Sequence, residues 1–525
     1  MKSRTILLLA ASLTVSPFAI AQPKPADAAP AGKTSNFSLT IYSNADPGLF
    51  DPQEYVESQG GKIPGYGVVR ETRKIDLIAG ENTIKFTDVA AGIDPTTVSF
   101  KSLTAPESTS VLEQNFEYDL VSPDKLLQKY IGHDIIINRK QEPLKDDRSH
   151  TPESIQGKLL SYDGYTFVLQ TENKQLPVQM VPRNADLSEI KLFDLQTGLI
   201  TKPTLVWKLA AEKGGTHEAQ VTYQTSGIAW RADYTVVVNK DDTAADIGAW
   251  VTVMNKSGAA FPQAKLKLIA GDVQRLKPLE DGYAKQNRYS GGTLVSDFAR
   301  PEFAEKSFFE FHLYTLNRAT SITNNSIKQI ELFSRKSNVP VVKTYVYHGL
   351  PAEDRQISTS NVQTDRSLGQ RGNTKVDVFL KTTNTEKNGL GIPLPAGRVR
   401  AYKRDTADGL EEFIGEDVIR HIPKDESILV RLGSAFDVVA ERTQKDFEEH
   451  VEQKTLTETF EIKLRNHKKE AVAVTVTENM IRWSNWEITK SSDKFEKKDF
   501  RTIHIPVEIP ADGEKILTYT VKYSW

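Results

Sequence analysis

The sequence predicts an all-β protein of several β-sandwich domains, with an inserted small β-barrel-like domain and few short helices. Hydrophobic and polar residues alternate with a period of two, in runs of about five to ten residues, as in half-buried strands. Gly, Asn, Asp and Pro separate these runs, and these residues favour turns. No segment sustains the 3.6-residue period of an amphipathic helix. The three observations agree on strands as the main element.

Composition excludes several classes of protein. The chain has 525 residues, 38% hydrophobic and 26% charged, a balance typical of folded globular proteins. Its formal net charge of −2 argues against a nucleic-acid-binding protein, which needs an excess of Lys and Arg. Cysteine is absent, which excludes disulfides, a lipid-modified cysteine and thiolate chemistry.

The N-terminus has the features of a secretory signal peptide. Lys2 and Arg4 precede a short apolar run, and an Ala-Ile-Ala triplet ends at Ala21 as a cleavage site. The apolar run is too short to span a bilayer, and no later stretch suggests a transmembrane helix. We therefore expect residues 1–21 to be removed by cleavage after Ala21, leaving a periplasmic or secreted protein. Residues 22–36 are rich in Pro and Ala and predict a flexible linker.

An N-terminal β domain is predicted over 37–122, followed by a small barrel-like insert over 123–200. Strands of the first domain are expected at 38–43, 68–78, 83–86, 98–103 and 111–118. The insert begins with a short helix over 123–130, for which Ser122 is the expected N-cap and Pro123 the first helical residue. Its five short strands are expected at 134–138, 157–162, 166–171, 176–180 and 187–193.

A central β domain is predicted over 201–440 and a C-terminal immunoglobulin-like sandwich over 441–525. In the central domain a bulky apolar face is expected from residues in alternating runs: Trp230, Tyr234, Val236, Val238, Trp250 and Val253. The polar, Gly-rich stretch 278–300 predicts a long surface loop, and such loops are often functional or disordered. Residues 446–454 are interpreted as one or two helical turns.

Four sequence motifs resemble a known family: 227–234 (Gly-Ile-Ala-Trp-Arg-Ala-Asp-Tyr), 249–258, 394–402 and 432–438. They are similar to motifs of bacterial exported proteins with a DUF4139 domain. The resemblance covers 203–525, and 65–119 resembles the N-terminal part that accompanies this domain. It implies an all-β exported protein of unassigned function and provides no catalytic residues to transfer. Some relatives carry a mucoidy-inhibitor label and a coiled-coil insertion. This chain lacks the coiled coil.

No catalytic motif is found in the sequence. His-Glu-x-x-His, G-x-S-x-G, the phosphate loop and GxGxxG are all absent. Ser-x-x-Lys spacing occurs at Ser122/Lys125 and Ser491/Lys494, but the partner motifs of penicillin-binding enzymes are missing, and the second pair is expected in a solvated turn. The sequence therefore assigns no catalytic residues and no cofactor.

No metal site is assigned either. The nine histidines lack the spacing of zinc ligands. Asp241, Asp242 and Asp246 form an acidic loop that could hold calcium through carboxylates, but the EF-hand pattern is missing. A solvated hairpin loop is the favoured interpretation.

Trp483 and Trp486 are the candidate binding surface. Two closely spaced indoles with polar neighbours could stack on a sugar or a peptide; alternatively, one of them, Trp486, fills the core of the last sandwich. At the C-terminus a strict alternation is compatible with the closing strand of that sandwich or with the terminal strand of an outer-membrane β-barrel: Leu517, Tyr519, Val521, Tyr523 and Trp525.

These observations favour an exported cell-envelope protein that acts by binding or as a scaffold, without catalysis. Its expected partner is an unidentified envelope protein or a polysaccharide, and no nucleic acid. One alternative is a periplasmic hydrolase with a site assembled from distant loops, 278–300 in particular. Another is an outer-membrane β-barrel protein.

Overall fold

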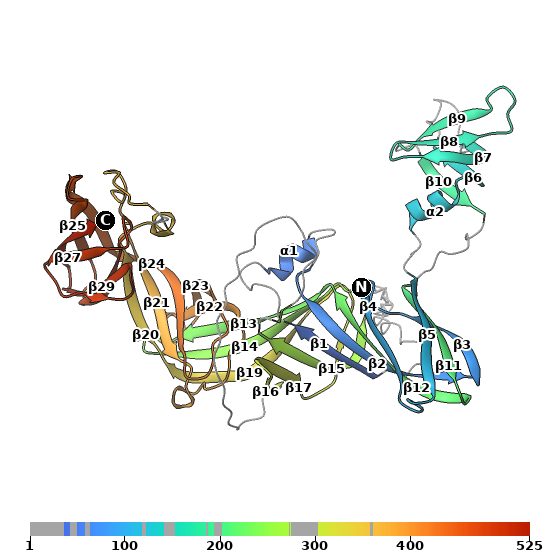
Figure 1. Cartoon of the computed structure of the whole chain (residues 1–525), viewed down its shortest axis with the longest axis horizontal. Helices are drawn as coiled ribbons and strands as arrows, with labels where there is room; N and C mark the ends of the chain where they lie inside the picture. Colours follow the sequence, from blue (N-terminus) through green and yellow to red (C-terminus); the bar gives the residue numbers. More distant parts are fainter. Residues whose placement is uncertain are drawn as a thin grey trace, which may run out of the picture.

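The computed structural model describes ten stretches of the chain: 36–42, 50–57, 63–117, 122–140, 153–184, 187–193, 202–271, 273–274, 303–356 and 361–525. About 64% of these residues are in strands and 5% in helices, which confirms the predicted all-β class. The molecule is elongated, with the C-terminal strands at one end and the strands of 80–87, 109–117 and 204–211 at the other (Figure 1). Among the described residues, no helix is long and apolar enough to cross a membrane.

One sheet has eight strands in the order β16-β17-β15-β1-β2-β12-β4, with β18 paired to β15. Its strands are β1 (Asn36–Tyr42), β2 (Tyr66–Leu77), β4 (Ile93–Ser102), β12 (Gly215–Ser226), β15 (Phe261–Ala270), β16 (Phe303–Phe308), β17 (Phe311–Leu316) and β18 (Thr320–Ile322). β1 runs parallel to β15 and antiparallel to β2. Strands assigned from sequence to the N-terminal and central domains thus share one sheet.

A five-stranded sheet packs on this sheet in the order β19-β14-β13-β22-β23. Its strands are β13 (Ile228–Val238), β14 (Ala244–Asn255), β19 (Ser326–Pro340), β22 (Gly397–Arg404) and β23 (Glu411–Ile419). Trp230, Tyr234 and Val253 lie in the core between the sheets, as predicted. The prediction for Trp250 is wrong, because its side chain is 44% exposed. Trp250 and Val253 are three positions apart in one strand and therefore lie on opposite faces.

A three-stranded sheet, β3-β11-β5, packs on one end of the eight-stranded sheet. Its strands are β3 (Gly80–Thr87), β5 (Thr109–Glu117) and β11 (Thr204–Ala211). The buried Trp207 ring lies 5.5 Å from the Phe86 ring and 5.3 Å from the Phe100 ring, centroid to centroid. Gly80 begins β3 with a φ of +98°, so this turn uses a conformation that favours glycine.

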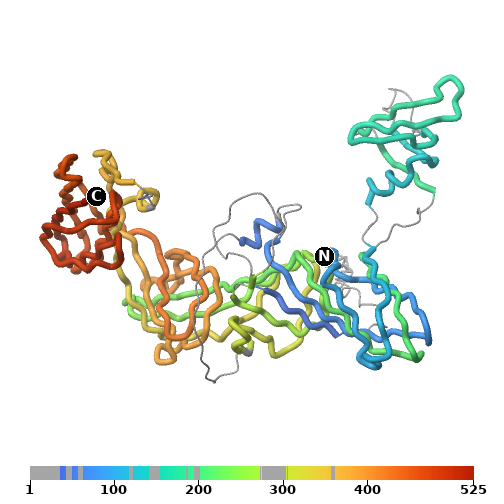
Figure 2. Tube along the Cα trace, viewed as in Figure 1, coloured from blue at the N-terminus to red at the C-terminus, as the bar shows by residue number. Residues whose placement is uncertain are grey.

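The insert has one helix and five strands in the order β10-β6-β7-β8-β9, and Figure 2 shows its trace standing away from the body. The elements are α2 (Pro123–Lys129), β6 (Asp134–Arg139), β7 (Glu153–Tyr162), β8 (Thr166–Gln170), β9 (Val178–Pro182) and β10 (Leu187–Leu192). Ser122 Oγ accepts a hydrogen bond from the Lys125 N–H, which confirms the predicted cap. Within the described residues β10 and β9 are the two edges of an open sheet, which departs from the expected barrel-like closure.

The C-terminal part is a nine-stranded sheet in the order β27-β30-β25-β24-β21-β20-β26-β29-β28. Its strands are β20 (Val342–His348), β21 (Lys375–Thr383), β24 (Ser427–His450), β25 (Thr455–Asn466), β26 (Val472–Asn479), β27 (Trp486–Ser491), β28 (Glu496–Lys497), β29 (Thr502–Ile509) and β30 (Gly513–Ser524). The remaining short helices are α1 (Pro52–Glu57), η1 (Ala352–Gln356) and η2 (Glu386–Asn388). Both halves of the sheet contribute to one core, so the sheet curls over itself.

The strand β24 continues through the segment expected to be helical. It extends to His450 because residues 438–450 pair with β25 along their length, and the prediction of a helix over 446–454 is therefore wrong. The sequence-based boundary at 440 also falls inside β24. The alternating residues of β30 are buried in the C-terminal core, as expected for a closing strand: Leu517, Tyr519, Val521 and Tyr523.

Candidate functional site

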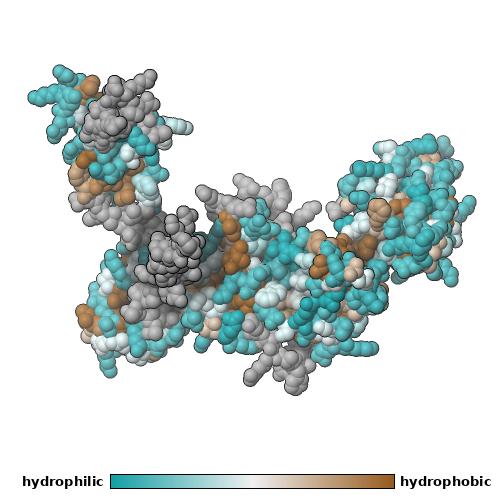
Figure 3. Space-filling model, turned by 180° about the vertical axis from the view of Figure 1, so that it is seen from behind, coloured by the Kyte–Doolittle hydropathy of each residue, from teal (hydrophilic) through white to brown (hydrophobic). Residues whose placement is uncertain are grey.

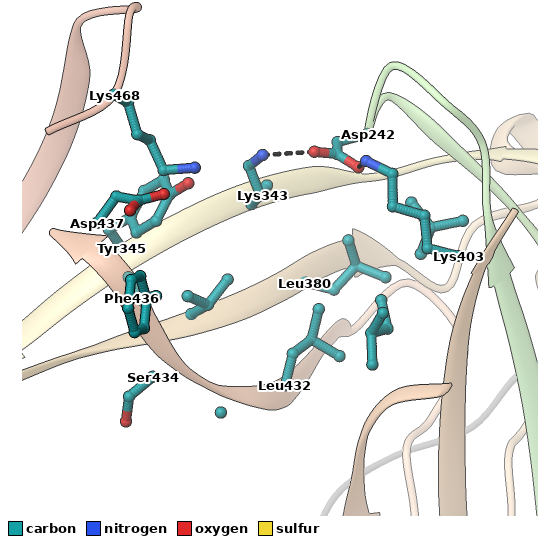
Figure 4. A pocket seen from close by; sticks show the side chains of 15 residues that line it. Asp242, Lys343, Tyr345, Leu380, Lys403, Leu432, Ser434, Phe436, Asp437 and Lys468 are labelled. Carbon is teal, nitrogen blue, oxygen red and sulfur yellow. Dashed lines mark hydrogen bonds and ion pairs between the residues drawn. The ribbon is translucent and has the colours of Figure 1, made fainter. Parts of the chain in front are cut away.

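A cavity of about 240 Å³ lies where the five-stranded sheet meets the nine-stranded sheet, and we call it the junction cleft (Figure 4). Its floor is apolar: Val238, Val378, Leu380, Ile414 and Leu432. Its rim carries charged side chains: Asp242, Lys343, Lys403, Asp437 and Lys468. On the face shown in Figure 3, hydrophobic residues gather between the central and C-terminal parts of the molecule. The cleft therefore combines apolar and charged contacts.

An irregular stretch of β24 forms one wall of the cleft. The pairing of β21 with β24 passes from Asp377↔Ser434 to Lys375↔Val439, so β24 has three more residues than β21 over this stretch. The extra residues bulge away from the ladder, as expected for a β-bulge. Phe436 lies in this bulge and is 94% exposed, although its neighbours belong to a long strand.

A glycine allows β23 to pass close to β24 beside this wall. Gly415 has a φ of +154°, and a Cβ at this position would lie 2.3 Å from the Leu432 carbonyl oxygen. No side chain fits at that distance, so a residue other than glycine would push the two strands apart. This close approach brings Ile414 and Leu432 together in the floor of the cleft.

Asp242 ties the two sheets together at the edge of the cleft. It lies at the tip of the β13–β14 hairpin, where Asn239 Oδ1 accepts hydrogen bonds from the N–H groups of Thr243 and Ala244 at 2.9 and 3.2 Å. The Asp242 carboxylate accepts hydrogen bonds from Lys343 on β20 and from Lys403 on β22. One carboxylate thus connects the five-stranded sheet to the nine-stranded sheet.

These ion pairs keep Asp242 and Lys343 charged. Burial opposes ionisation of Asp242, but hydrogen bonds from Lys343 and Lys403 outweigh it and lower the pKa of this carboxyl. Burial likewise opposes the charge of Lys343, but the hydrogen bond to Asp242 raises the pKa of its ammonium group. Because one carboxylate faces two ammonium groups, this edge of the cleft keeps a positive charge.

Two groups at the cleft remain open to a ligand. The Lys468 ammonium lies 5.9 Å from the centroid of the Tyr345 ring and makes no ion pair with any described residue. Phe436 lies on the same side of the cleft, with Tyr345 and Asp437 between it and Lys468 in Figure 4, and its ring is in solvent. Asp437 adds one negative charge, so three lysines face two aspartates around the rim. The rim is therefore cationic overall.

Two carboxylates of the acidic hairpin, which the sequence offered as a calcium site, form ion pairs. Asp242 pairs with lysines as described, and Asp246 lies 3.4 Å from Arg335. In the described part of the chain, no three His, Asp or Glu side chains are placed to share a metal ion. The calcium hypothesis for Asp241, Asp242 and Asp246 thus gains no support from their geometry.

The other candidates from the sequence lie away from the cleft. Trp483 and Trp486 are both partly buried and pack against the C-terminal core. The Trp486 indole N–H donates to the Phe500 carbonyl at 2.7 Å, and Lys497 lies 4.3 Å from its ring. Ser491 Oγ donates to the Asp493 carbonyl within its own turn. The predicted loop 278–300 and the signal segment 1–21 lie outside the described residues.

A family model described as a domain of unknown function (DUF4139) matches residues 219–525. The chain belongs to the DUF4139 family. Every residue that lines the junction cleft lies in this DUF4139 region, which runs from within β12 to the C-terminus. No curated protein matches the chain.

The four motifs that resemble DUF4139 proteins occupy two places in the fold. Three of them lie in or next to β13, β14 and β22, which are neighbours in the five-stranded sheet. The fourth, 432–438, forms the bulge of β24 and supplies six of the residues that line the cleft. In the sequence this motif could have drawn attention to Phe436, but nothing local links it to Lys343, Lys403 or Lys468.

Proposed function

We propose that this DUF4139 protein is an exported, non-catalytic binding protein of the cell envelope, and that its junction cleft binds an acidic segment of a partner protein. One observation carries the proposal: a cationic rim with an exposed phenylalanine surrounds an apolar floor. Ammonium groups attract carboxylates, and a desolvated aromatic contact stabilises a bound segment. Export rests on the signal peptide features of residues 1–21.

The size of the cleft favours a polypeptide ligand. Sites that enclose a drug-sized molecule measure roughly 300–1,000 Å³. The junction cleft, at about 240 Å³, is smaller and suits one or two apolar side chains that enter from a bound chain. The rim lysines would then contact acidic residues on either side of the buried side chain.

The serine hydroxyl group at the cleft is engaged in structural contacts, which supports binding over catalysis. Ser434 Oγ donates a hydrogen bond to Asp377 at 3.2 Å, and Arg431 donates to the same carboxylate oxygen at 2.8 Å. The Asp377 carboxylate oxygen nearest the serine is thus already engaged by an arginine. These contacts anchor the bulge that presents Phe436.

Fluorescence anisotropy with labelled peptides tests the proposal. The peptides carry Asp and Glu around one central Phe, Leu or Trp, and a matched basic set carries Lys and Arg instead. We expect saturable binding of acidic peptides, weakened about tenfold or more by Lys468→Glu and by Phe436→Ser, which corresponds to about 1.4 kcal/mol. Absence of binding, or equal binding of the basic set, would reject the proposal.

Matched variants control for nonspecific effects of charge and surface hydrophobicity. Lys469→Glu changes the charge of the next residue, whose side chain is 88% exposed and pairs with Asp512. Phe309→Ser removes another highly exposed ring, 85% exposed, in the turn between β16 and β17. Both variants should bind the acidic peptides as the unmodified protein does.

A further inference from the structure

A second surface, on the outer face of the five-stranded sheet, carries features of a different binding site. Alternation along the strands directs three pairs of motif residues away from the core: Arg231 and Asp233 on β13, Trp250 and Thr252 on β14, and Arg398 and Arg400 on β22. Asp233 pairs in register with Trp250 on one side and with Arg398 on the other. Three of the four motifs therefore meet on one surface, which we call the outer platform.

The Trp250 indole lies beside open space on this platform. Its side chain is 44% exposed, in a strand whose other face is buried. Gly248 lies two positions earlier on the same face, and a Cβ there would have nothing within 4 Å. The pairing of β14 with β19 shifts register between Ala245 and Trp250, and such irregularities often occur beside binding sites. The indole is therefore accessible from the outer face of the sheet.

A chain of buried polar contacts fixes the platform from below. Asp233 and Arg231 are 7% and 5% exposed and form an ion pair at 3.1 Å. Thr252 donates a hydrogen bond to Asp233, and Gln329 donates to Thr252 at 3.2 Å. At one end of the platform Arg231 donates to the carbonyl of Phe50, just before α1. These contacts hold the surface in one arrangement before any ligand binds.

Arg400 offers hydrogen-bond donors in the middle of the platform. Its guanidinium lies 3.5 Å from Glu416 and 4.0 Å from Asp233, and it makes no hydrogen bond to either carboxylate. The side chain is 39% exposed. Farther along β22 the Tyr402 ring packs edge to face on Phe413 at 5.8 Å, and Phe413 is 56% exposed. Aromatic rings thus flank a central group of charged donors and acceptors.

The charges of the platform define the ligand class. Three guanidinium groups face four carboxylates: Arg231, Arg398 and Arg400 against Asp51, Asp233, Glu331 and Glu416. A surface with this balance does not favour an anion. Planar charged side chains can bind neighbouring hydroxyl groups, and an indole provides a flat apolar contact. We propose that the outer platform binds a neutral oligosaccharide, with one sugar ring stacked on Trp250 and hydroxyl groups of the neighbouring sugar rings bound by Arg400 and Glu416.

Isothermal titration calorimetry with neutral tetrasaccharides tests this inference. The panel consists of chitotetraose, cellotetraose, maltotetraose and mannotetraose, and a hyaluronan tetrasaccharide serves as the anionic comparison. We expect saturable binding of at least one neutral member, weakened about tenfold or more by Trp250→Ala. Arg400→Met should weaken binding as well, and Trp250→Phe, which keeps an aromatic face, should retain most of it.

The test separates this site from the junction cleft. Phe436→Ser should leave saccharide binding unchanged, and Trp250→Ala should leave acidic-peptide binding unchanged. Thermal melting confirms the fold of each variant, which is expected because Trp250 and Arg400 are partly in solvent. The inference is overturned if no neutral tetrasaccharide binds at millimolar concentration, if the hyaluronan fragment binds best, or if both Trp250→Ala and Arg400→Met bind normally.

Discussion

Arg482 and Glu458 form an ion pair at 2.7 Å in which the two side chains are only 1% and 3% exposed. Arg482 also donates hydrogen bonds to the carbonyl oxygens of Gln363, Asp365 and Leu368. One guanidinium therefore fastens the segment before β21 to the C-terminal core. Removing one partner of a buried pair leaves an uncompensated charge, so such a pair is sensitive to single substitutions.

Replacing this arginine should strongly destabilise the C-terminal part. Arg482→Met leaves the Glu458 carboxylate buried without its partner, at a cost of about 3–5 kcal/mol of unfolding free energy. Arg371→Met is the control, because Arg371 is 76% exposed and its ion pair with Glu353 is superficial, worth at most about 1 kcal/mol. Urea unfolding of both variants measures the difference. Equal unfolding midpoints would show that the buried pair contributes nothing.

A methyl group at Gly349 should disrupt the neighbouring buried pair. Arg442 and Glu478 are joined at 3.0 Å, and a Cβ at Gly349 would lie 1.7 Å from Glu478 Oε1. Gly349→Ala therefore forces the carboxylate from its place, with an expected loss of about 3 kcal/mol. Gly164→Ala, where a Cβ meets no atom within 4 Å, should be nearly neutral. Differential scanning calorimetry compares them, and equal melting temperatures would contradict the packing described.

The Asp242 bridge should stabilise the protein only where its carboxyl is ionised. Its pKa is lowered in the folded state, so the stabilisation is complete above the unfolded value of about 3.9 and is lost as pH falls through the lower folded value. Asp242→Asn should cost about 1–2 kcal/mol near neutral pH. The difference from the unmodified protein should shrink below about pH 4. Urea unfolding of both proteins across this pH range measures the difference in stability. A difference that does not change with pH would contradict the stabilising role of the Asp242 bridge.

His348 should make the fold sensitive to mild acid. Burial, with a smaller effect from the nearby Arg355, lowers the pKa of His348 to about 4. Between about pH 6.5 and pH 4 this histidine is protonated in the unfolded state but not in the folded state. Its contribution to the free energy of unfolding is therefore complete above about pH 6.5 and falls as the pH drops toward 4. Allowing for its partial exposure, the loss is about 1–2 kcal/mol. In His348→Gln this part of the pH dependence should disappear from the unfolding midpoint; if the two pH profiles coincide, the histidine is not responsible.

The strands could be predicted because each hydrophobic pattern lies within one short segment. The pairing of the strands could not, because it joins residues that are far apart in the chain. Ser38 and Lys265 are parallel neighbours in one sheet, although more than two hundred residues separate them. Trp250 was assigned to the core because it is bulky, and only its register beside Asp233 shows which face it occupies. Side-chain bulk is a weak guide to which face of a strand is buried.

The junction cleft could not be predicted from the sequence for the same reason: its residues are far apart in the chain. Asp242 stood out as part of an acidic loop, but its partners Lys343 and Lys403 follow 101 and 161 residues later. No pattern in the sequence connects these three side chains. Only the meeting of two sheets turns an acidic hairpin and scattered lysines into a cationic rim.

Photo-crosslinking at the rim of the cleft tests the proposed function most directly. A benzoyl-phenylalanine is placed at Phe436, with the same substitution at Phe309 as the exposed control. We predict that an acidic peptide with one central aromatic residue crosslinks at position 436 and not at 309. Unlabelled acidic peptide, but not its basic counterpart, should compete, and Lys468→Glu should strongly reduce the product. Equal crosslinking at both positions, or none at 436, would contradict a binding role for the junction cleft.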